Sequence, residues 1–345
     1  MTLRGRSFLN TADFSLDQIH GLVDLALGLK LGRVKRQLPG KMLAMVFFNP
    51  SLRTRASFTA AMYRLGGVAV DLPLGQGGWP LEFGEGVVMD GAAAEHVREA
   101  APVIGRYCNA LAVRSSELVV AGGASGTTGS WAESKKDRVV QSFARFAGVP
   151  VINMESNVYH PCQGLGDAVT LKEKLGRPQG KKYVLTWAYH PKALPMATPN
   201  SQLAAACDQG MEVVVTHPPG WELDPDIVET ASARAQAAGG SLTFSSSMAE
   251  AVEGAHVVCA KSWGALKYYG DWETEKLIRQ ELKGWIVDEA LMRRTDHGVF
   301  MHCLPVRRNI VVSDAVLDGS WSIVVDQAEN RLWAQMALLA EVLAN

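Results

Sequence analysis

The chain has 345 residues, of which 48% are hydrophobic, so it can bury a core in each of about two domains. Its 34 basic and 35 acidic residues leave a net charge of −1, which gives no electrostatic reason to expect nucleic acid or a membrane surface as a partner. The five cysteines are scattered and form no CxxC pair, so they indicate neither a disulfide framework nor a zinc knuckle and favour reduced thiols in a cytoplasmic enzyme. No signal-peptide core or run of ~20 apolar residues occurs.

Strands and helices alternate along the first half of the chain. A capping box at Ser15 predicts a helix that runs to about Leu29. Two glycine-rich stretches, at 75–80 and 122–138, are expected to be loops, the second of them long and mobile. The other expected elements are strands at 41–48, 68–72, 110–114 and 149–155, and helices at 54–65, at 95–106 and before Phe146.

The alternation pauses between 164 and 181 and then resumes. Strands are expected at 182–190, 211–218, 256–261, 285–289 and 299–305, a helix at 200–208, and an amphipathic helix at 328–343. Two blocks of strand–helix alternation predict an α/β protein with two doubly wound parallel-sheet domains.

The stretch FFNPSLRTRASF, residues 47–58, places hydroxyls and two arginines between a strand and a helix. A helix N-terminus offers unpaired N–H groups, and arginine adds planar donors that match phosphate or carboxylate. Ser51 could equally serve only as the cap of a solvated helix start. From spacing alone, an anion site and a plain helix cap are equally favoured.

Further polar side chains follow other predicted strands. Arg114, Glu155 and Lys261 end strands, and Cys303 lies in the last one, with Arg307 just beyond it. In open parallel sheets, ligands bind beyond the carboxyl ends of the strands. A single histidine at a strand end is more often structural, and a single lysine is more often solvated. These polar residues taken together, however, indicate a binding site rich in cations. Because only Glu155 supplies a carboxylate, metal-assisted hydrolysis and glycosidase chemistry are disfavoured, and we expect no metal.

Three short motifs resemble those of the aspartate/ornithine carbamoyltransferase family. SLRTR at Ser51 resembles the family's carbamoyl-phosphate motif, HPCQ at His160 its H-P-x-Q motif, and HCLP at His302 its ornithine-type motif. The resemblance implies a carbamoyl-phosphate domain, residues 1–160, onto which the C-terminal helix (about 328–345) packs back. It implies an amino-acid domain at 161–327 and a cytoplasmic homotrimer with shared active sites, without metal or organic cofactor.

The resemblance also assigns roles to individual residues. Cys303 and the carbonyl of Leu304 would orient the attacking amine, and Trp79 would enter the pocket from a neighbouring subunit. Donors aimed at the developing oxyanion are worth ~3–4 kcal/mol each. By the motifs, the phosphate would be held by Ser51, Leu52, Arg53 and Thr54, and the carbamoyl group would be surrounded by Arg53, Thr54, Arg114, His160 and Gln163.

The identity of the amine follows from a departure from the ornithine-type pattern. Where those enzymes carry an aspartate for the substrate's α-ammonium, this chain reads AKSWGA, with Lys261. A cation there would repel an ammonium, so the resemblance points to the N-acylornithine branch, which shares AKSWG, WAYHPK and VMDG. Glu155, Lys261 and Arg307 would then hold the polar groups of the acylated substrate.

Two positions bear on the acyl group. Acetyl-type relatives resemble this chain but have an acidic residue where Ala94 stands and a lysine where Val311 stands. An acidic residue near the terminal carboxylate of a succinyl group would repel it, by roughly 1 kcal/mol in water and ~4 kcal/mol at an effective dielectric of 20 for ~4 Å. The resemblance therefore favours N-succinylornithine carbamoylation in arginine biosynthesis, although neutral drift at Ala94 would leave N-acetylornithine as the substrate.

Two rivals from other classes remain open at this point. A catalytically silent binding protein with the same fold is disfavoured by the joint presence of Arg53, Arg114, His160, Gln163 and Cys303. A nicotinamide-dependent dehydrogenase is disfavoured because no glycine fingerprint follows a predicted strand and opens a helix. The partners expected are carbamoyl phosphate and N-acylornithine.

Overall fold

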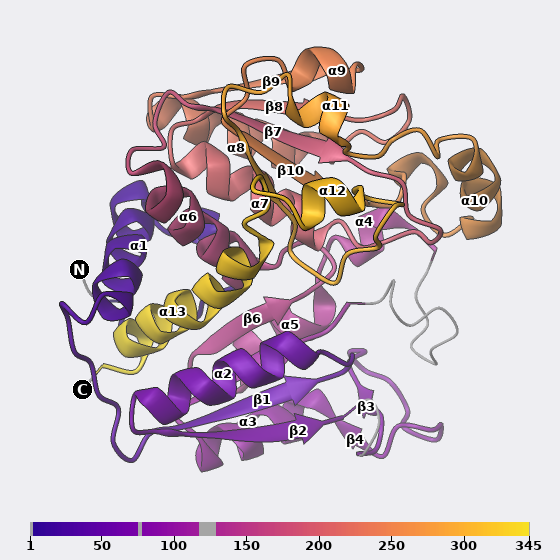
Figure 1. Cartoon of the computed structure of the whole chain (residues 1–345). Helices are drawn as coiled ribbons and strands as arrows, with labels where there is room; N and C mark the ends of the chain where they lie inside the picture. The colour runs from indigo at the N-terminus through magenta and orange to yellow at the C-terminus, as the bar shows by residue number, and fades with distance from the viewer. Residues whose placement is uncertain (1–2, 75–77, 117–128, 345) are drawn as a thin grey trace.

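The computed structural model describes residues 3–74, 78–116 and 129–344. Figure 1 shows two parallel sheets, one above the other in that view, with helices around each and between them. This arrangement confirms the predicted α/β class with parallel sheets. The predicted domain boundary at 160/161 stays a prediction, and the glycine-rich residues 75–77 and 122–128 lie outside the described parts of the chain.

The first sheet has four parallel strands in the order β2-β1-β5-β6. Its strands carry apolar side chains on both faces: Leu43, Met45 and Phe47 of β1 enter one core, whereas Ala44 and Val46 enter another. This two-sided burial is typical of parallel sheets that helices cover on both faces. The strands are β1 (Met42–Phe47), β2 (Val68–Pro73), β5 (Ala110–Arg114) and β6 (Val151–Glu155).

Short elements complete this part of the chain. A two-stranded parallel pair, β3 (Leu81–Glu82) and β4 (Glu95–His96), stands beside the sheet. The helices are α2 (Leu52–Arg64), α3 (Val97–Tyr107), α4 (Trp131–Ser134) and α5 (Arg138–Phe146).

The second sheet has five parallel strands in the order β11-β10-β7-β8-β9. They are β7 (Lys182–Trp187), β8 (Glu212–Thr216), β9 (Ser241–Ser245), β10 (Val257–Lys261) and β11 (Val299–Met301). The helices around this sheet are α7 (Ala197–Asp208), α8 (Pro225–Ala237), α9 (Met248–Ala251), α10 (Trp272–Gln280), α11 (Glu289–Met292) and α12 (Asp314–Leu317), with the 3₁₀ turn η3 (Leu266–Tyr268). A second 3₁₀ turn, η1 (Thr11–Asp13), contacts α7 and the helix at Pro161–Leu175.

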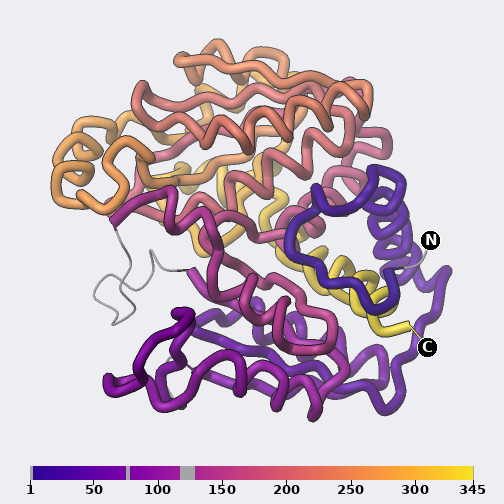
Figure 2. The backbone as a smooth tube through the Cα atoms, turned by 180° about the vertical axis from the view of Figure 1, so that it is seen from behind, coloured from indigo at the N-terminus to yellow at the C-terminus, as the bar shows by residue number. Residues whose placement is uncertain are grey.

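Three helices join the two halves: α1 (Leu16–Lys30), α6 (Pro161–Leu175) and α13 (Val324–Val342). Helix α13 packs against α6, α1 and α2, so the end of the chain returns to the first sheet, and both termini lie on the same side of the molecule (Figures 1 and 2). Gly166 permits the close contact with α13, because a Cβ there would lie 3.0 Å from Cγ of Arg331. None of the described helices is long and apolar enough to cross a membrane.

The register of the strands sets the position of the functional side chains. Phe47 pairs with Arg114, and Arg114 pairs with Glu155, so β1, β5 and β6 end side by side. In the second sheet, β10 ends at Lys261 opposite Trp187 of β7. In each sheet the chain order reverses next to these ends, between β1 and β5 and between β7 and β10. This is the topological switch point at which open α/β sheets bind ligands.

Several sequence predictions of local structure are wrong. The expected strand at 285–289 does not form: Val287 makes only a single bridge to Val312, and Asp288 caps the helix that begins at Glu289. Part of the expected loop at 122–138 is helix α4, which Ser130 caps.

Two further segments differ from the prediction in where a helix or strand begins or ends. Most of the pause expected at 164–181 belongs to helix α6, which has Pro161 in its first turn. The last strand ends at Met301 instead of continuing to 305. The capping box at Ser15 is confirmed, with Gln18 as its reciprocal partner.

Candidate active site

A cavity of about 250 Å³ lies at the ends of the strands of both sheets. Its walls come from the start of α2, the ends of β5, β6 and β10, the starts of α6 and α7, the segment after β11, and α13. Eleven of the predicted site residues line it: Ser51, Arg53, Thr54, Arg114, Glu155, His160, Gln163, Lys261, Cys303, Leu304 and Arg307.

The start of α2 forms one wall. Ser51 has an extended backbone, and its hydroxyl accepts a hydrogen bond from the N–H of Thr54 at 3.3 Å, so it caps the helix as the simpler interpretation predicted. Arg53 lines the cavity beside this cap, whereas Arg55 pairs with Asp71 and stacks on Phe47. The two arginines of the motif therefore face different surroundings, and only Arg53 is available to a ligand in the cavity.

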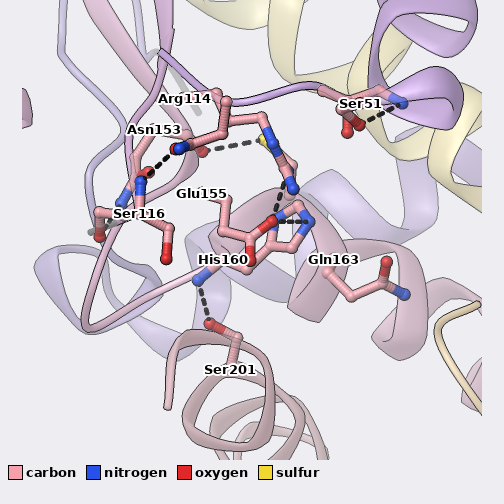
Figure 3. Close-up of polar contacts among 12 residues, drawn as sticks. Ser51, Arg114, Ser116, Asn153, Glu155, His160, Gln163 and Ser201 are labelled. Carbon is pink, nitrogen blue, oxygen red and sulfur yellow. Dashed lines mark hydrogen bonds and ion pairs between the residues drawn. The ribbon is translucent and has the colours of Figure 1, made fainter. Parts of the chain in front are cut away.

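The ends of β5 and β6 bring Arg114, Glu155 and His160 together, as Figure 3 shows. Arg114 Nη1 forms an ion pair with Oε2 of Glu155, and both side chains are almost fully buried. His160 Nε2 lies 3.8 Å from the same carboxylate oxygen. The carboxylate is thus already compensated by a guanidinium before any ligand arrives.

His160 is neutral at the cavity wall. Burial is the main cause that holds its pKa well below the usual value, and the nearby Arg331, Arg114 and Lys261 act in the same direction. Its backbone N–H donates to Oγ of Ser201 at 2.8 Å, which fixes the residue at the start of α6. Among the described residues, its buried Nδ1 has no hydrogen-bond partner. A neutral imidazole with a free ring nitrogen can donate to, or accept from, a bound group.

Sequence reasoning missed Arg331, which α13 brings into the cavity wall from 277 residues along the chain from Thr54. Its Nη2 donates to Oγ1 of Thr54 at 2.9 Å, and its buried Nε has no partner among the described residues. The only signal in the sequence was a run of polar residues inside the apolar pattern of this helix, namely Gln327, Asn330 and Arg331. An arginine at such a place needs a buried acceptor or a ligand.

The opposite wall belongs to the second sheet. Lys261 ends β10 and is 9% exposed, and Arg307 donates from Nε to Nε2 of His190 at 3.0 Å. Burial lowers the pKa of His190 to about 4, so its ring is neutral and accepts this hydrogen bond. His190 lies in the WAYHPK stretch but is not among the predicted site residues, because its neighbour Arg307 is 117 residues away in the sequence.

The segment after β11 contributes Cys303 and Leu304. Burial raises the pKa of the Cys303 thiol, so it stays protonated at neutral pH. The N–H of Leu304 donates to Nδ1 of His302 at 3.0 Å, and Leu304 has a φ of 53° before a cis proline. A thiol and a backbone carbonyl at this wall are suited to orient a neutral amine.

The described lining is strongly cationic. Five cationic side chains belong to it. Arg114 is paired with an acid of the described wall, and the other four are not. Glu155 is the only acidic residue of the described lining. The cations are Arg53, Arg114, Lys261, Arg307 and Arg331. Within the described parts of the chain, no three His, Cys, Asp or Glu side chains gather as metal ligands would. The cavity therefore suits an anionic ligand with several carboxylate or phosphate oxygens.

Three predicted site residues do not line the cavity of the single chain. Leu52 is 80% exposed, and Trp79 is 57% exposed. Trp79 and Ala94 belong to a lobe of residues 78–96, which we call the Trp79 lobe. There, Trp79 Nε1 donates to Glu95 Oε2 at 2.8 Å, and the N–H of Ala94 donates to the carbonyl of Pro80 at 3.3 Å.

Comparison with known families covers most of the chain. Residues 6–173 match the aspartate/ornithine carbamoyltransferase carbamoyl-P binding domain, and residues 196–342 match the Asp/Orn binding domain of the same family. The chain belongs to this family. The family predicted from the three motifs is therefore confirmed, and with it the predicted carbamoyltransferase fold.

Individual relatives lie in the N-acylornithine branch. The chain is 46% identical to the N-acetylornithine carbamoyltransferase of Xanthomonas campestris pv. campestris over 338 residues, 97% of each protein. It is 38% identical to the N-succinylornithine carbamoyltransferase of Bacteroides fragilis, over 88% of each.

Solved structures of N-acetylornithine transcarbamylases are also similar to this chain. Acetylornithine transcarbamylase complexed with acetylcitrulline superposes with a TM-score of 0.93 at 44% identity, covering 99% of this chain and 100% of that one. A glutamate-to-alanine variant of N-acetyl-L-ornithine transcarbamylase, complexed with carbamyl phosphate and N-succinyl-L-norvaline, superposes with a TM-score of 0.91 at 45% identity, over 97% and 99% of the chains.

Proposed function

We propose that this carbamoyltransferase transfers the carbamoyl group of carbamoyl phosphate to the side-chain amine of N-succinyl-L-ornithine, giving N-succinyl-L-citrulline and phosphate. The observation that carries the N-acyl part of this proposal is the state of Glu155. It is the only acid of the described cavity lining, and Arg114 already pairs with it. A substrate with a free α-ammonium would find cations and no unpaired carboxylate there, whereas an acylated nitrogen carries no charge.

On the phosphate side, the start of α2 and Arg53 hold the phosphate of carbamoyl phosphate. The phosphate leaves as an anion, and the helix terminus and the guanidinium stabilise its growing charge. The carbamoyl oxygen lies among donors from Arg53, Thr54, Arg114 and His160, with Arg331 behind Thr54. These donors stabilise the oxyanion of the tetrahedral intermediate.

On the amine side, Cys303 and the carbonyl of Leu304 orient the neutral side-chain nitrogen toward the carbamoyl carbon. Lys261 and Arg307 bind the α-carboxylate and the acyl oxygen of the substrate, and His190 keeps Arg307 in place. Because both substrates lie in one cavity, the reaction between them becomes effectively intramolecular.

The succinyl preference rests on charge. A succinyl group adds a second carboxylate, and the described lining has four cations beyond the one paired with Glu155. Where the acetyl-type pattern has an acidic residue this chain has Ala94, and where that pattern has a lysine it has Val311. The binding of N-succinyl-L-norvaline by a glutamate-to-alanine variant of the acetyl-type enzyme supports alanine as compatible with a succinyl ligand.

N-acetylornithine is the second candidate, and the identity of 46% to an N-acetylornithine carbamoyltransferase favours it. An alanine at position 94 admits the smaller acetyl group as well. In either case we place the enzyme in cytoplasmic arginine biosynthesis, because both branches of relatives act on acylated ornithine.

We further propose a homotrimer in which the Trp79 lobe of one subunit completes the cavity of its neighbour. An exposed tryptophan, outside its own cavity but hydrogen-bonded into a defined position, supports this arrangement. Val88, at 83% exposed, lies in the same lobe and adds apolar surface for a subunit contact.

A colorimetric citrulline assay tests the substrate. Carbamoyl phosphate is supplied with ornithine, N-acetylornithine or N-succinylornithine in parallel, and we expect the largest kcat/KM with N-succinylornithine. A preference for N-acetylornithine would reject the succinyl assignment and keep the mechanism. Turnover of plain ornithine would contradict the argument from Glu155, and absence of turnover with all three would favour a silent homologue.

A further inference from the structure

A buried carboxylate lies one helical turn behind the cavity wall. Asp167 is on α6, four residues after Gln163, and is 0% exposed. Its Oδ1 accepts two hydrogen bonds, from Nε2 of Gln163 at 2.8 Å and from Nε2 of Gln327 on α13 at 2.7 Å. Gln163 lines the cavity, whereas Asp167 does not.

The chemistry of these groups fixes the orientation of one amide. A side-chain amide has an oxygen that accepts and an NH₂ group that donates, and an ionised carboxylate only accepts. Rotating the Gln163 amide by half a turn would place its oxygen against the Asp167 oxygen, which exchanges a charge-assisted hydrogen bond for repulsion between two acceptors. The NH₂ end therefore points to Asp167, and the amide oxygen is the end that remains for a ligand.

The same carboxylate orients a second amide. With its Nε2 bound to Asp167, Gln327 accepts through Oε1 from the backbone N–H of His302 at 2.9 Å. His302 directly precedes Cys303 at the amine wall. Burial raises the pKa of Asp167 to about 6, while the hydrogen bonds from Gln327 and Gln163 oppose that rise, so the side chain is ionised at pH 7.5.

We propose that Asp167 is a positioning residue that sets the orientation of the Gln163 amide and thereby selects for an acyl phosphate whose acyl group carries an N–H donor. The oxygen of Gln163 accepts from the NH₂ of a carbamoyl group but has nothing to accept from a methyl group of similar size. Asp167 thus makes the cavity discriminate carbamoyl phosphate from acetyl phosphate. This inference rests on the proposed position of the carbamoyl group beside Gln163.

Two stable probes isolate this selection from the amine substrate. Phosphonoacetamide carries the amide NH₂, and 2-oxopropylphosphonate carries a methyl group in its place. We expect calorimetric titration of the intact enzyme at pH 7.5 to show that the amide probe binds about tenfold or more tightly than the methyl probe. In Asp167→Asn, either end of the Gln163 amide can face the cavity, so the ratio of the two affinities falls to within about threefold. Inorganic phosphate binding stays unchanged.

A matched control separates orientation from general loosening of the two helices. Thr170→Val removes a buried hydrogen bond between α6 and α13, from Asn330 Nδ2 at 3.1 Å, without touching Gln163. Its probe ratio stays at the wild-type value. The double variant Gln163→Met/Asp167→Asn has the same ratio as Gln163→Met alone, because Asp167 acts through Gln163.

The outcomes are distinct. An unchanged probe ratio in a folded Asp167→Asn variant overturns the inference. If Asp167→Asn does not fold, Asp167→Ser takes its place. The serine hydroxyl can donate or accept, so it no longer dictates which end of the Gln163 amide faces the cavity. A probe ratio reduced about twofold or more then supports the inference, whereas an unchanged ratio overturns it. Absence of binding of both probes and of phosphate to the wild-type enzyme would instead reject the proposed carbamoyl-phosphate site.

Discussion

The two parts of the proposed active site differ in how they are held. The cavity residues of α2, β6 and α6 are buried: Thr54 is 1% exposed, His160 5% and Glu155 8%. Arg331 holds Thr54, and Arg114 holds Glu155. The Trp79 lobe, by contrast, is exposed and held by short contacts of its own. In the proposed mechanism, a single chain therefore preorganises the phosphate and carbamoyl contacts, and the acyl end of the site depends on the Trp79 lobe of a neighbouring subunit.

Loss of Arg53 is expected to have the largest effect. Arg53→Ala removes the cavity arginine beside the helix start and lowers kcat/KM by about 10²–10³-fold or more, since one donor to developing charge is worth that much. The melting temperature stays near the wild-type value, because Arg53 is partly exposed at the cavity and is not one of the buried core residues. Citrulline assays and thermal unfolding measure the two quantities.

A second arginine of the same helix supplies the control. Arg64 lies in the last turn of α2, outside the described cavity lining, and stacks on Trp333. Arg64→Ala is expected to keep activity within about twofold while costing roughly 1 kcal/mol or less of stability. Equal losses in Arg53→Ala and Arg64→Ala would contradict the assignment of the cavity.

The Trp79 lobe gives the next effect. Trp79→Ala is expected to lower kcat/KM for the acylated amine by about thirtyfold, the cost of removing a well-packed aromatic contact at an interface. Its effect on the folded monomer is small, because the side chain is 57% exposed. Tyr63→Ala, an 82% exposed aromatic on α2, is the matched control and should leave kcat/KM unchanged. If Trp79→Ala retained full kcat/KM, the lobe would have no part in the site.

Charge in the same lobe tests the acyl group. Ala94→Glu is expected to lower kcat/KM for N-succinylornithine by about fivefold or more, the factor that corresponds to ~1 kcal/mol of repulsion in water. Activity with N-acetylornithine changes less, because its acyl group has no carboxylate. Ala92→Glu adds the same charge two residues away and controls for the net charge of the lobe. Equal losses with both substrates would reject Ala94 as a specificity position.

The smallest effect concerns stability against pH. Burial holds the pKa of His160 and of His302 well below the usual value in the folded chain, so the unfolded chain binds more protons near pH 6.5. Stability therefore rises with pH in this window and falls as the pH drops from 7 to 6, by about 0.7 kcal/mol per pH unit and histidine at pH 6.5.

Denaturant titrations at pH 7 and 6 measure this slope. As the pH falls through about 6, Asp167 acts in the opposite direction and reduces the total slope, because burial raises its pKa to about 6 and the folded state then binds the extra proton. His302→Gln removes one histidine and should reduce the slope between pH 7 and 6. A slope that His302→Gln leaves unchanged would contradict a neutral, buried His302.

The sequence predicted those parts of the site that follow strands, and the reason is local. Arg114, Glu155 and Lys261 each end an apolar run, and parallel pairing brings the ends of neighbouring strands together at one edge of each sheet. Arg331 and His190 were missed because their partners lie far away in the sequence, on elements whose packing no local pattern reveals.

The errors in secondary structure have the same origin. The run at 285–289 has strand composition, yet Val287 finds a single bridge partner and Asp288 starts a helix instead. Helix α6 was not predicted because proline and glycine usually interrupt helices. Here Pro161 lies in the first turn, and Gly166 allows the close contact with α13.

The activity of hybrid assemblies made from two defective subunits shows whether residues of two chains form one active site. Arg53→Ala and Trp79→Ala chains are co-expressed with different tags, and assemblies that carry both tags are purified. In a cyclic trimer with a site at each subunit boundary, every hybrid has one boundary with an intact Arg53 and an intact Trp79, so about one third of wild-type activity returns. If the hybrids are no more active than the two parent variants, each site is built within one chain and the account is wrong.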